Sequence, residues 1–192
     1  MNAAAGRPPS FALVVLATCM AFVVGQLDVT IVNVALPAMA RSLRADVAQL
    51  QWVVDAYAVA FAAFMLSAGA LGDRFGARHA FQWGMAVFAL ASLSCALAAD
   101  AAVLDAARAA QGLGAAVMLP NSLALLNHAL AHDVRARARG IGYWTAAGAI
   151  SIALGPVLGG LLVASTGWPA IFWVNVPLCA LGLWLVRRLP ET

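Results

Sequence analysis

Charge is scarce in this sequence, and lysine is missing from it altogether. Only 10% of the 192 residues are charged, all eleven basic residues are arginine, and 64% of the chain is hydrophobic. So low a charge content excludes an ordinary soluble domain of this length. The net charge of +3 is also too small for a nucleic-acid-binding protein, whose domains carry dense basic patches. The composition therefore predicts a membrane protein whose surroundings are the lipid bilayer.

Cysteine is rare too, and its placement excludes several kinds of site. Cys19, Cys95 and Cys179 all lie within apolar runs, which is typical of small buried side chains rather than of disulfides or metal ligands. His128 and His132 have the spacing of a helical metal pair, but no further ligand lies near them in the sequence. There is no glycine-rich phosphate loop and no nucleophile with a partner base, so we expect neither an enzyme nor a metal site.

Apolar stretches of about 20 residues, the length that an α-helix needs to cross a bilayer, recur along the chain. They predict an all-α membrane protein in which six transmembrane helices form one bundle (residues 11–187), between a leader (1–10) and a tail (188–192). Each half has three helices, so the halves point in opposite directions, as in the inverted repeats of transporters. The expected helices cover residues 11–36, 49–71, 79–99, 103–126, 140–165 and 170–186.

The expected connections are polar or glycine-rich. Pro37 closes the first helix, and residues 132–139 (HDVRARAR) separate the fourth from the fifth. Residues 72–78 (GDRFGAR) make a tight turn in which Asp73 can cap the third helix.

Arginine placement predicts the orientation of the bundle. Cytoplasmic loops of membrane proteins carry the excess of basic residues. With both termini in the cytoplasm, the cytoplasmic side receives Arg7, Arg74, Arg78, Arg135, Arg137, Arg139, Arg187 and Arg188, and the other side only Arg41 and Arg44. We therefore expect cytoplasmic termini and a multi-pass protein of the plasma or inner membrane.

Asp28 is the residue with the clearest functional meaning, because it places a carboxylate inside the first apolar span. A charged side chain at bilayer depth costs roughly 2.5–3.5 kcal/mol on insertion scales and usually marks a transport pathway or a proton relay. Helix rise puts Asp28 about 13 Å below the outer end of its helix and Arg108 about 8 Å below the same surface. The two residues are predicted to meet, with Asp28 as the group that gains and loses a proton. The alternative is a static ion pair that only fixes helix packing.

Four stretches resemble motifs of the major facilitator superfamily, in the branch of fourteen-helix drug:proton antiporters. They match in order and spacing: LDVTIVNVALP (27–37), GALGDRFGARH (69–79), LDAARAAQGLGAA (104–116) and the segment 142–160 that ends in GPVLGG. FWVNVP (172–177) also resembles the start of the sixth helix in this branch.

The resemblance implies roles for individual residues. Asp28 and Arg108 would couple transport to protons. The loop motif would serve conformational switching through Gly69, Asp73, Arg74, Gly76 and Arg78, and the motif of the fifth helix would contribute to antiport through Gly142, Gly155, Pro156, Gly159 and Gly160. Further candidates for the cavity are Thr30, Asn33, Asp55 and Gln111, although Asp55 beside Trp52 and Tyr57 is also typical of an interfacial acid.

The implied function is proton-coupled efflux of drugs or other hydrophobic or cationic small molecules, driven by the proton gradient without a cofactor. Such a transporter needs a second bundle of six or eight helices, from a continuation of the same gene, a partner chain or a homodimer. We expect this chain to be truncated before that bundle. The alternative is a transport-incompetent fragment or a membrane partner subunit.

Overall fold

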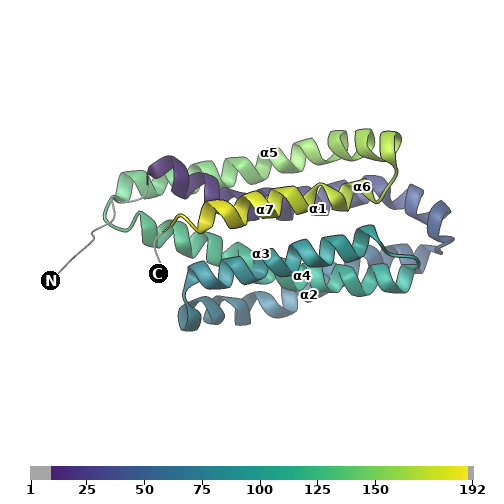
Figure 1. Cartoon of the computed structure of the whole chain (residues 1–192), viewed down its shortest axis with the longest axis horizontal. Coiled ribbons are helices and arrows are strands. Elements are labelled where there is room, and N and C mark those ends of the chain that lie inside the picture. Colours follow the sequence, from purple (N-terminus) through teal and green to yellow (C-terminus); the bar gives the residue numbers. More distant parts are fainter. Residues whose placement is uncertain (1–9, 190–192) are drawn as a thin grey trace.

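The computed structural model describes residues 10–189, and helices make up nearly all of that range (Figure 1). The predicted all-α class is confirmed. Residues 1–9 and 190–192, which include Arg7 and most of the predicted leader and tail, lie outside the described residues. The helices are α1 (Phe11–Leu43), α2 (Val47–Phe75), α3 (Ala77–Ala96), α4 (Ala101–Ala129), α5 (Val134–Thr166), α6 (Ala170–Trp173) and α7 (Asn175–Val186).

In the described part of the chain, four helices are long and apolar enough to cross a membrane: α1, α2, α4 and α5. The 20-residue helix α3 lies beside them, and α6 and α7 follow one another as a sixth, shorter apolar rod over Ala170–Val186. The start of α1 and the end of α7 lie at the same end of the bundle (Figure 1), hereafter the terminal end. Which side of a membrane this end faces stays a prediction from the arginines.

The first helix is longer than predicted. Pro37 does not end α1, which continues to Leu43 and stops at Arg44, a residue with a left-handed φ of 50°. Proline deletes one backbone hydrogen bond, and a long packed helix can tolerate that loss. The stop comes instead from the left-handed residue, whose N–H bonds back to the carbonyl of Ala40.

Two connections predicted as turns are largely helical. α2 runs to Phe75, and the break before α3 is confined to Gly76, whose φ of 87° suits a residue without Cβ. Asp73 therefore lies in the last turn of α2, and the prediction that its side chain caps the next helix is wrong, because α3 has no side-chain cap. Likewise α5 begins at Val134, since Asp133 accepts a hydrogen bond from the N–H of Ala136 at 2.9 Å.

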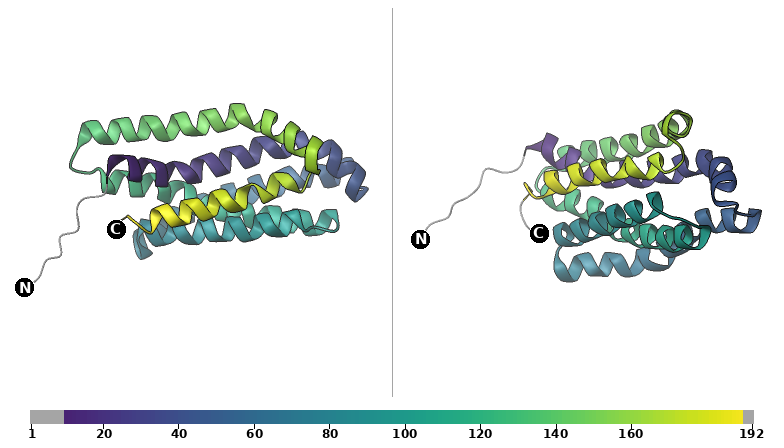
Figure 2. Two further views of the ribbon diagram at one scale, coloured as in Figure 1. Left: turned by 45° about the horizontal axis from the view of Figure 1, so that its top comes forward. Right: turned by 45° about the vertical axis from the view of Figure 1, so that its right-hand side comes forward.

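One helix from each half of the chain packs against the central helix of the other half. α2 packs mainly on α4, and α5 packs mainly on α1, so each central helix is covered by a helix of the other half. Figure 2 shows α5 running along α1 on one side of the bundle and α2, α3 and α4 grouped on the other. This exchange, with α1 and α4 in equivalent central places, is the arrangement expected of two three-helix units in opposite orientations.

The predicted sixth helix is interrupted at Val174, between α6 and α7. Pro177 explains the interruption, because proline has no N–H for the carbonyl of Trp173, four residues before it, and its ring crowds that carbonyl. The break places Asn175 at the first position of α7, where its side chain is completely buried.

The buried side chains form two hydrophobic clusters along the bundle. One lies toward the terminal end and includes Phe81, Phe88 and Met118. The other lies toward the opposite end and includes Ile31 and Phe172. Along α1, Asp28 falls between the parts of the helix that belong to these two clusters.

Candidate functional site

Asp28 lies near the middle of the 33-residue helix α1 and has no exposed surface. The outer end of α1 lies farther from Asp28 than predicted, because α1 continues beyond Pro37 to Leu43. A carboxylate buried in this way needs a cation and hydrogen-bond donors to offset its lost hydration. The structure supplies both from other helices.

Arg108 of α4 is the cation, as predicted. Its Nη1 donates to Asp28 Oδ2 at 2.5 Å, and its side chain is as buried as its partner. Its Nε donates to the backbone carbonyl of Val53 on α2 at 2.9 Å, and the ring of Tyr57 lies 4.5 Å from its Cζ. The guanidinium is therefore fixed by three helices and an aromatic face, which also offsets part of its desolvation.

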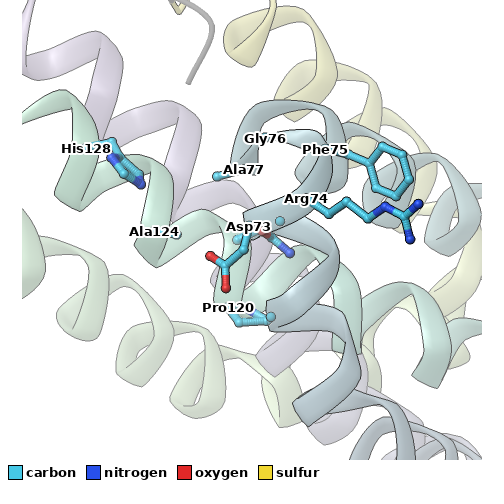
Figure 3. A pocket seen from close by; sticks show the side chains of 11 residues that line it. Asp73, Arg74, Phe75, Gly76, Ala77, Pro120, Ala124 and His128 are labelled. Carbon is cyan, nitrogen blue, oxygen red and sulfur yellow. The ribbon is translucent and has the colours of Figure 1, made fainter.

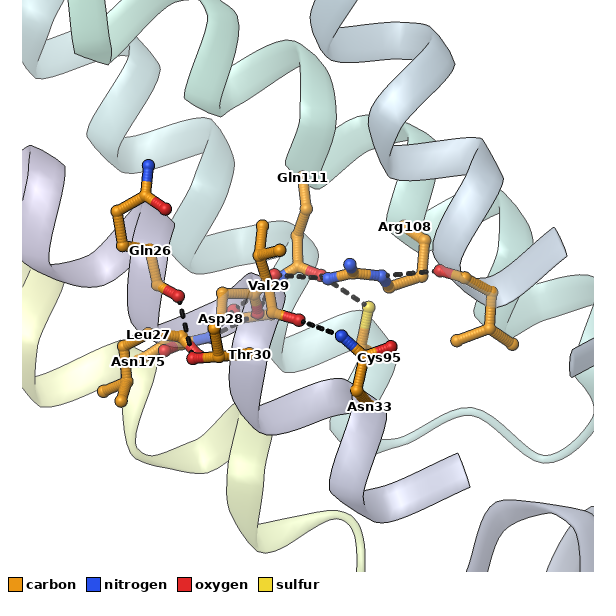
Figure 4. Close-up of polar contacts among 12 residues, drawn as sticks. Gln26, Leu27, Asp28, Val29, Thr30, Asn33, Cys95, Arg108, Gln111 and Asn175 are labelled. Carbon is orange, nitrogen blue, oxygen red and sulfur yellow. Dashed lines mark hydrogen bonds and ion pairs between the residues drawn. The ribbon is translucent and has the colours of Figure 1, made fainter. Parts of the chain in front are cut away.

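Neutral side chains complete the shell around Asp28 (Figure 4). Gln111 donates to Asp28 Oδ1 at 3.2 Å and accepts from Arg108 at 2.8 Å. Asn175 of α7 donates to the same Oδ1 at 2.9 Å, and Ser92 of α3 accepts from both amides, at 2.6 and 3.1 Å. These five buried residues, Asp28, Ser92, Arg108, Gln111 and Asn175, are called the Asp28 cluster below.

Sequence reasoning missed three residues at this site. Asn175 was visible as the polar residue of FWVNVP (172–177) in an apolar span, a signal that points to an interior partner. Ser92 and Cys95, whose thiol donates to Gln111 at 3.2 Å, carry no such signal. Nearby Ser94 is as polar as Ser92, yet it is exposed and bonds only to its own helix at Leu90.

A cleft of about 240 Å³ opens beside the cluster, between α1, α2 and α4. Its walls are mostly apolar, with Gln26, Tyr57 and Arg108 as the polar groups. Asp28 does not line the cleft in the described structure, but Arg108, its ion-pair partner, does. A molecule in the cleft would lie against Arg108, and Asp28 would affect it by neutralising the charge of Arg108.

Residues 18–192 match the family model of the Major Facilitator Superfamily. The chain belongs to the major facilitator superfamily. The predicted resemblance is thereby confirmed, and so is a multi-pass membrane protein.

Several curated relatives that match this chain are named as resistance or efflux proteins. The methylenomycin A resistance protein of Streptomyces coelicolor is 47% identical over 167 residues, which cover 87% of this chain and 35% of that protein. The multidrug resistance protein Stp of Mycobacterium tuberculosis is 46% identical over 173 residues, covering 90% and 32%. The drug efflux pump JefA of the same species is 43% identical over 178 residues, covering 93% and 35%. The chain thus spans about a third of the length of these relatives.

A solved structure supports the superfamily fold. The inward-open xylose transporter XylE of Escherichia coli superposes with a TM-score of 0.79 at 14% sequence identity, covering 95% of this chain and 48% of that one. The match covers one half of a complete superfamily transporter.

The secondary candidates separate into two groups. Gln111 belongs to the Asp28 cluster, whereas Thr30, Asn33 and Asp55 do not. Thr30 bonds to the backbone of its own helix and lies against α5, and Asn33 is exposed and bonds to Val29. Asp55 is partly exposed on α2, away from the hydrogen bonds of the cluster.

The superfamily's loop motif lies at the terminal end, around a second cavity of about 580 Å³ (Figure 3). Asp73 and Arg74 belong to the last turn of α2 and are exposed, and His128 lies across the cavity on α4. Arg78 lies on α3 and donates to the carbonyl of Arg187 at 3.0 Å. In the part of the chain that the structure describes, no three His, Cys, Asp or Glu side chains gather into a metal site.

The motif of the fifth helix has two faces. Gly155 and Gly159 are buried against α1, where a Cβ on Gly155 would overlap the side chain of Thr30, and one on Gly159 would come within 2.8 Å of Ile31. These two glycines let α1 and α5 approach closely. Pro156 is exposed, and a Cβ built at the remaining pair, Gly142 and Gly160, would meet no atom of another helix within 4 Å.

Proposed function

We propose that this chain is the N-terminal bundle of a proton-coupled exporter of drugs or other hydrophobic or cationic molecules in the plasma membrane. The observation that carries the proposal is the buried Asp28–Arg108 pair beside an apolar cleft. The names of the relatives support the substrate class, and the proton gradient would be the energy source without a cofactor.

The pair can couple a proton to a substrate through charge. Arginine stays protonated in proteins, so Asp28 is the member whose charge can change. While Asp28 is ionised, it neutralises Arg108 in the wall of the cleft. Once Asp28 takes up a proton, Arg108 is an uncompensated cation there and disfavours a cationic molecule in the cleft. Proton uptake and substrate binding then oppose each other, which is the linkage that antiport requires.

The movement that exposes the cleft to alternate sides needs a second bundle. Superfamily halves rock as rigid bodies around a central site. Exposed faces of α2 and α5 offer an apolar surface for that contact, and their large side chains include Val59, Phe64, Met65, Leu66, Ile150, Leu154, Val157 and Leu161. In this proposal the second bundle packs on these two faces.

The test is efflux of a fluorescent lipophilic cation from membrane vesicles with an imposed proton gradient, using the polypeptide together with its second bundle. Asp28→Asn keeps the side-chain shape but cannot carry a proton, so gradient-driven efflux should be lost. Asp55→Asn is the matched control, because Asp55 is a carboxylate on a neighbouring helix outside the cluster, and it should transport normally. Undiminished efflux by the Asp28→Asn variant would refute the proposal.

A further inference from the structure

The hydrogen bonds around Asp28 suit only one of its two protonation states. Its two oxygens face three N–H donors, from Arg108 at 2.5 Å, Asn175 at 2.9 Å and Gln111 at 3.2 Å. Such a shell stabilises a carboxylate. A proton on Oδ1 would point at the amide groups of Asn175 and Gln111, and both present donors there. For Asp28 to hold a proton in place, one of these donors must become an acceptor.

Two of the three donors cannot become the acceptor for a proton on Asp28. Arg108 has no acceptor atom. Gln111 has a carbonyl oxygen, but that oxygen already accepts from Arg108 at 2.8 Å and from the thiol of Cys95 at 3.2 Å. Asn175 differs, because its Oδ1 is buried and has no hydrogen-bond partner in the described structure. An unpartnered buried carbonyl costs free energy unless some other state uses it.

We propose that Asn175 is a positioning residue whose side-chain amide reverses when Asp28 is protonated, donating to the carboxylate and accepting from the carboxylic acid. This inference rests on the proposed function, in which Asp28 carries the proton.

The reversal is a rotation about one side-chain bond. The oxygen and nitrogen of an amide have nearly the same size, so a half-turn places Oδ1 where Nδ2 now lies. There it is within 2.9 Å of Asp28 Oδ1 and 3.1 Å of Ser92 Oγ. The Asp28 hydroxyl then donates to Asn175, and Ser92 donates with its own hydroxyl while still accepting from Gln111. One proton is taken up, and no covalent bond breaks.

In the present orientation the Asn175 carbonyl is the group without a partner, and the rotation gives it two donors, the Asp28 hydroxyl and the Ser92 hydroxyl. The charge on Asp28 decides between the two orientations.

The neighbouring titratable groups leave Asp28 as the one that changes charge. Tyrosine and cysteine side chains are ordinarily neutral below about pH 8, and arginine keeps its proton. α6 has no titratable side chain, and those of α5 lie in its first three turns, beside Phe11. The groups that interact electrostatically with Asp28 are Arg108 from α4, Tyr57 from α2, Cys95 from α3 and Cys179 from α7.

The experiment is infrared difference spectroscopy against pH on the full polypeptide in lipid bilayers, with ¹³C in the side-chain carbonyl of asparagine. The band of Asn175 is assigned by its loss in Asn175→Leu, or in Asn175→Ser if the first variant does not insert. The carboxyl band of Asp28 is assigned by its loss in Asp28→Asn. Asn33→Leu removes an exposed amide outside the cluster and is the control that should leave both bands in place.

The expected result is a shift of the Asn175 carbonyl band to lower frequency as its oxygen gains a hydrogen bond, with the same pH midpoint as the Asp28 band. The shift should vanish in Asp28→Asn. If Asp28 takes up its proton and the Asn175 band stays unmoved, the switch is wrong and proton coupling at Asp28 stands. If Asp28 takes up no proton at any pH at which the bundle stays folded, the coupling proposal fails and the switch fails with it.

Discussion

Removing Arg108 alone should destabilise the bundle more than removing both charges of the pair. In Arg108→Met the side chain keeps an unbranched apolar stem without the guanidinium, and the fully buried Asp28 retains only two neutral amide donors, from Gln111 and Asn175. Removing one partner of a buried ion pair typically costs about 3–5 kcal/mol. In the double variant Asp28→Asn, Arg108→Met no charge is left behind. We therefore expect it to lose only about 1–2 kcal/mol, from the bonds to the Val53 carbonyl and to Gln111.

The cysteines provide the assay. Cys19, Cys95 and Cys179 are free and buried, so a thiol-reactive fluorogenic dye reports unfolding in detergent or bilayers. Unfolding free energies of the wild type, both single variants and the double variant give the coupling between Asp28 and Arg108. A coupling below about 0.5 kcal/mol would refute the claim that the two charges depend on each other.

Two further predictions concern α5. Gly155→Ala should lower the free energy of unfolding by about 1–3 kcal/mol, because the new Cβ overlaps Thr30 across the contact with α1. Gly160→Ala is the control, because its Cβ meets open space, and it should be neutral or slightly stabilising. Equal effects of the two variants in the dye assay would contradict the close contact between α1 and α5. Asp133→Ala should cost about 1 kcal/mol of helix stability, because it removes the hydrogen bond to the Ala136 N–H. The measurement is hydrogen exchange, which should become faster in the first turn of α5, with the later turns as the internal control. Unchanged exchange in the first turn would show that the cap is dispensable.

The sequence was sufficient to predict six helical segments (α6 and α7 counted as one), their order, and the contact between Asp28 and Arg108. Apolar length predicts membrane spans because the bilayer has a fixed thickness. A charge inside such a span must face the interior, so two opposite charges at similar depth are expected to meet.

The helix ends could not be predicted from hydropathy. Arg135, Arg137 and Arg139 are polar, and yet they form the first turns of α5 behind the Asp133 cap. Hydropathy marks where a helix enters lipid, whereas hydrogen bonds and caps decide where it begins. The prediction that Pro37 ends the first helix was wrong for a related reason. A single lost hydrogen bond does not outweigh the packing of the residues around it.

The uncharged residues Ser92 and Asn175 of the site were not predicted from the sequence either. Asn175 reaches Asp28 because α7 packs on α1, and Ser92 joins the cluster through Gln111 and Asn175 because α3 packs on α4 and α7. Those contacts depend on the tertiary arrangement. A serine in an apolar span more often bonds to its own helix, as Ser94 does, so sequence alone gives no reason to select Ser92.

The Asp28 cluster and the Val53 carbonyl that accepts from Arg108 join α1, α2, α3, α4 and α7 by hydrogen bonds. α5 supplies no group to these bonds; it contacts α1 through Gly155 and Gly159 and donates from Trp144 to Ser122 of α4 at 3.1 Å. Five helices are thus tied to one another at a single level, while α5 is attached to the bundle by separate contacts. A change in the position of α5 would leave every hydrogen bond of the Asp28 cluster in place.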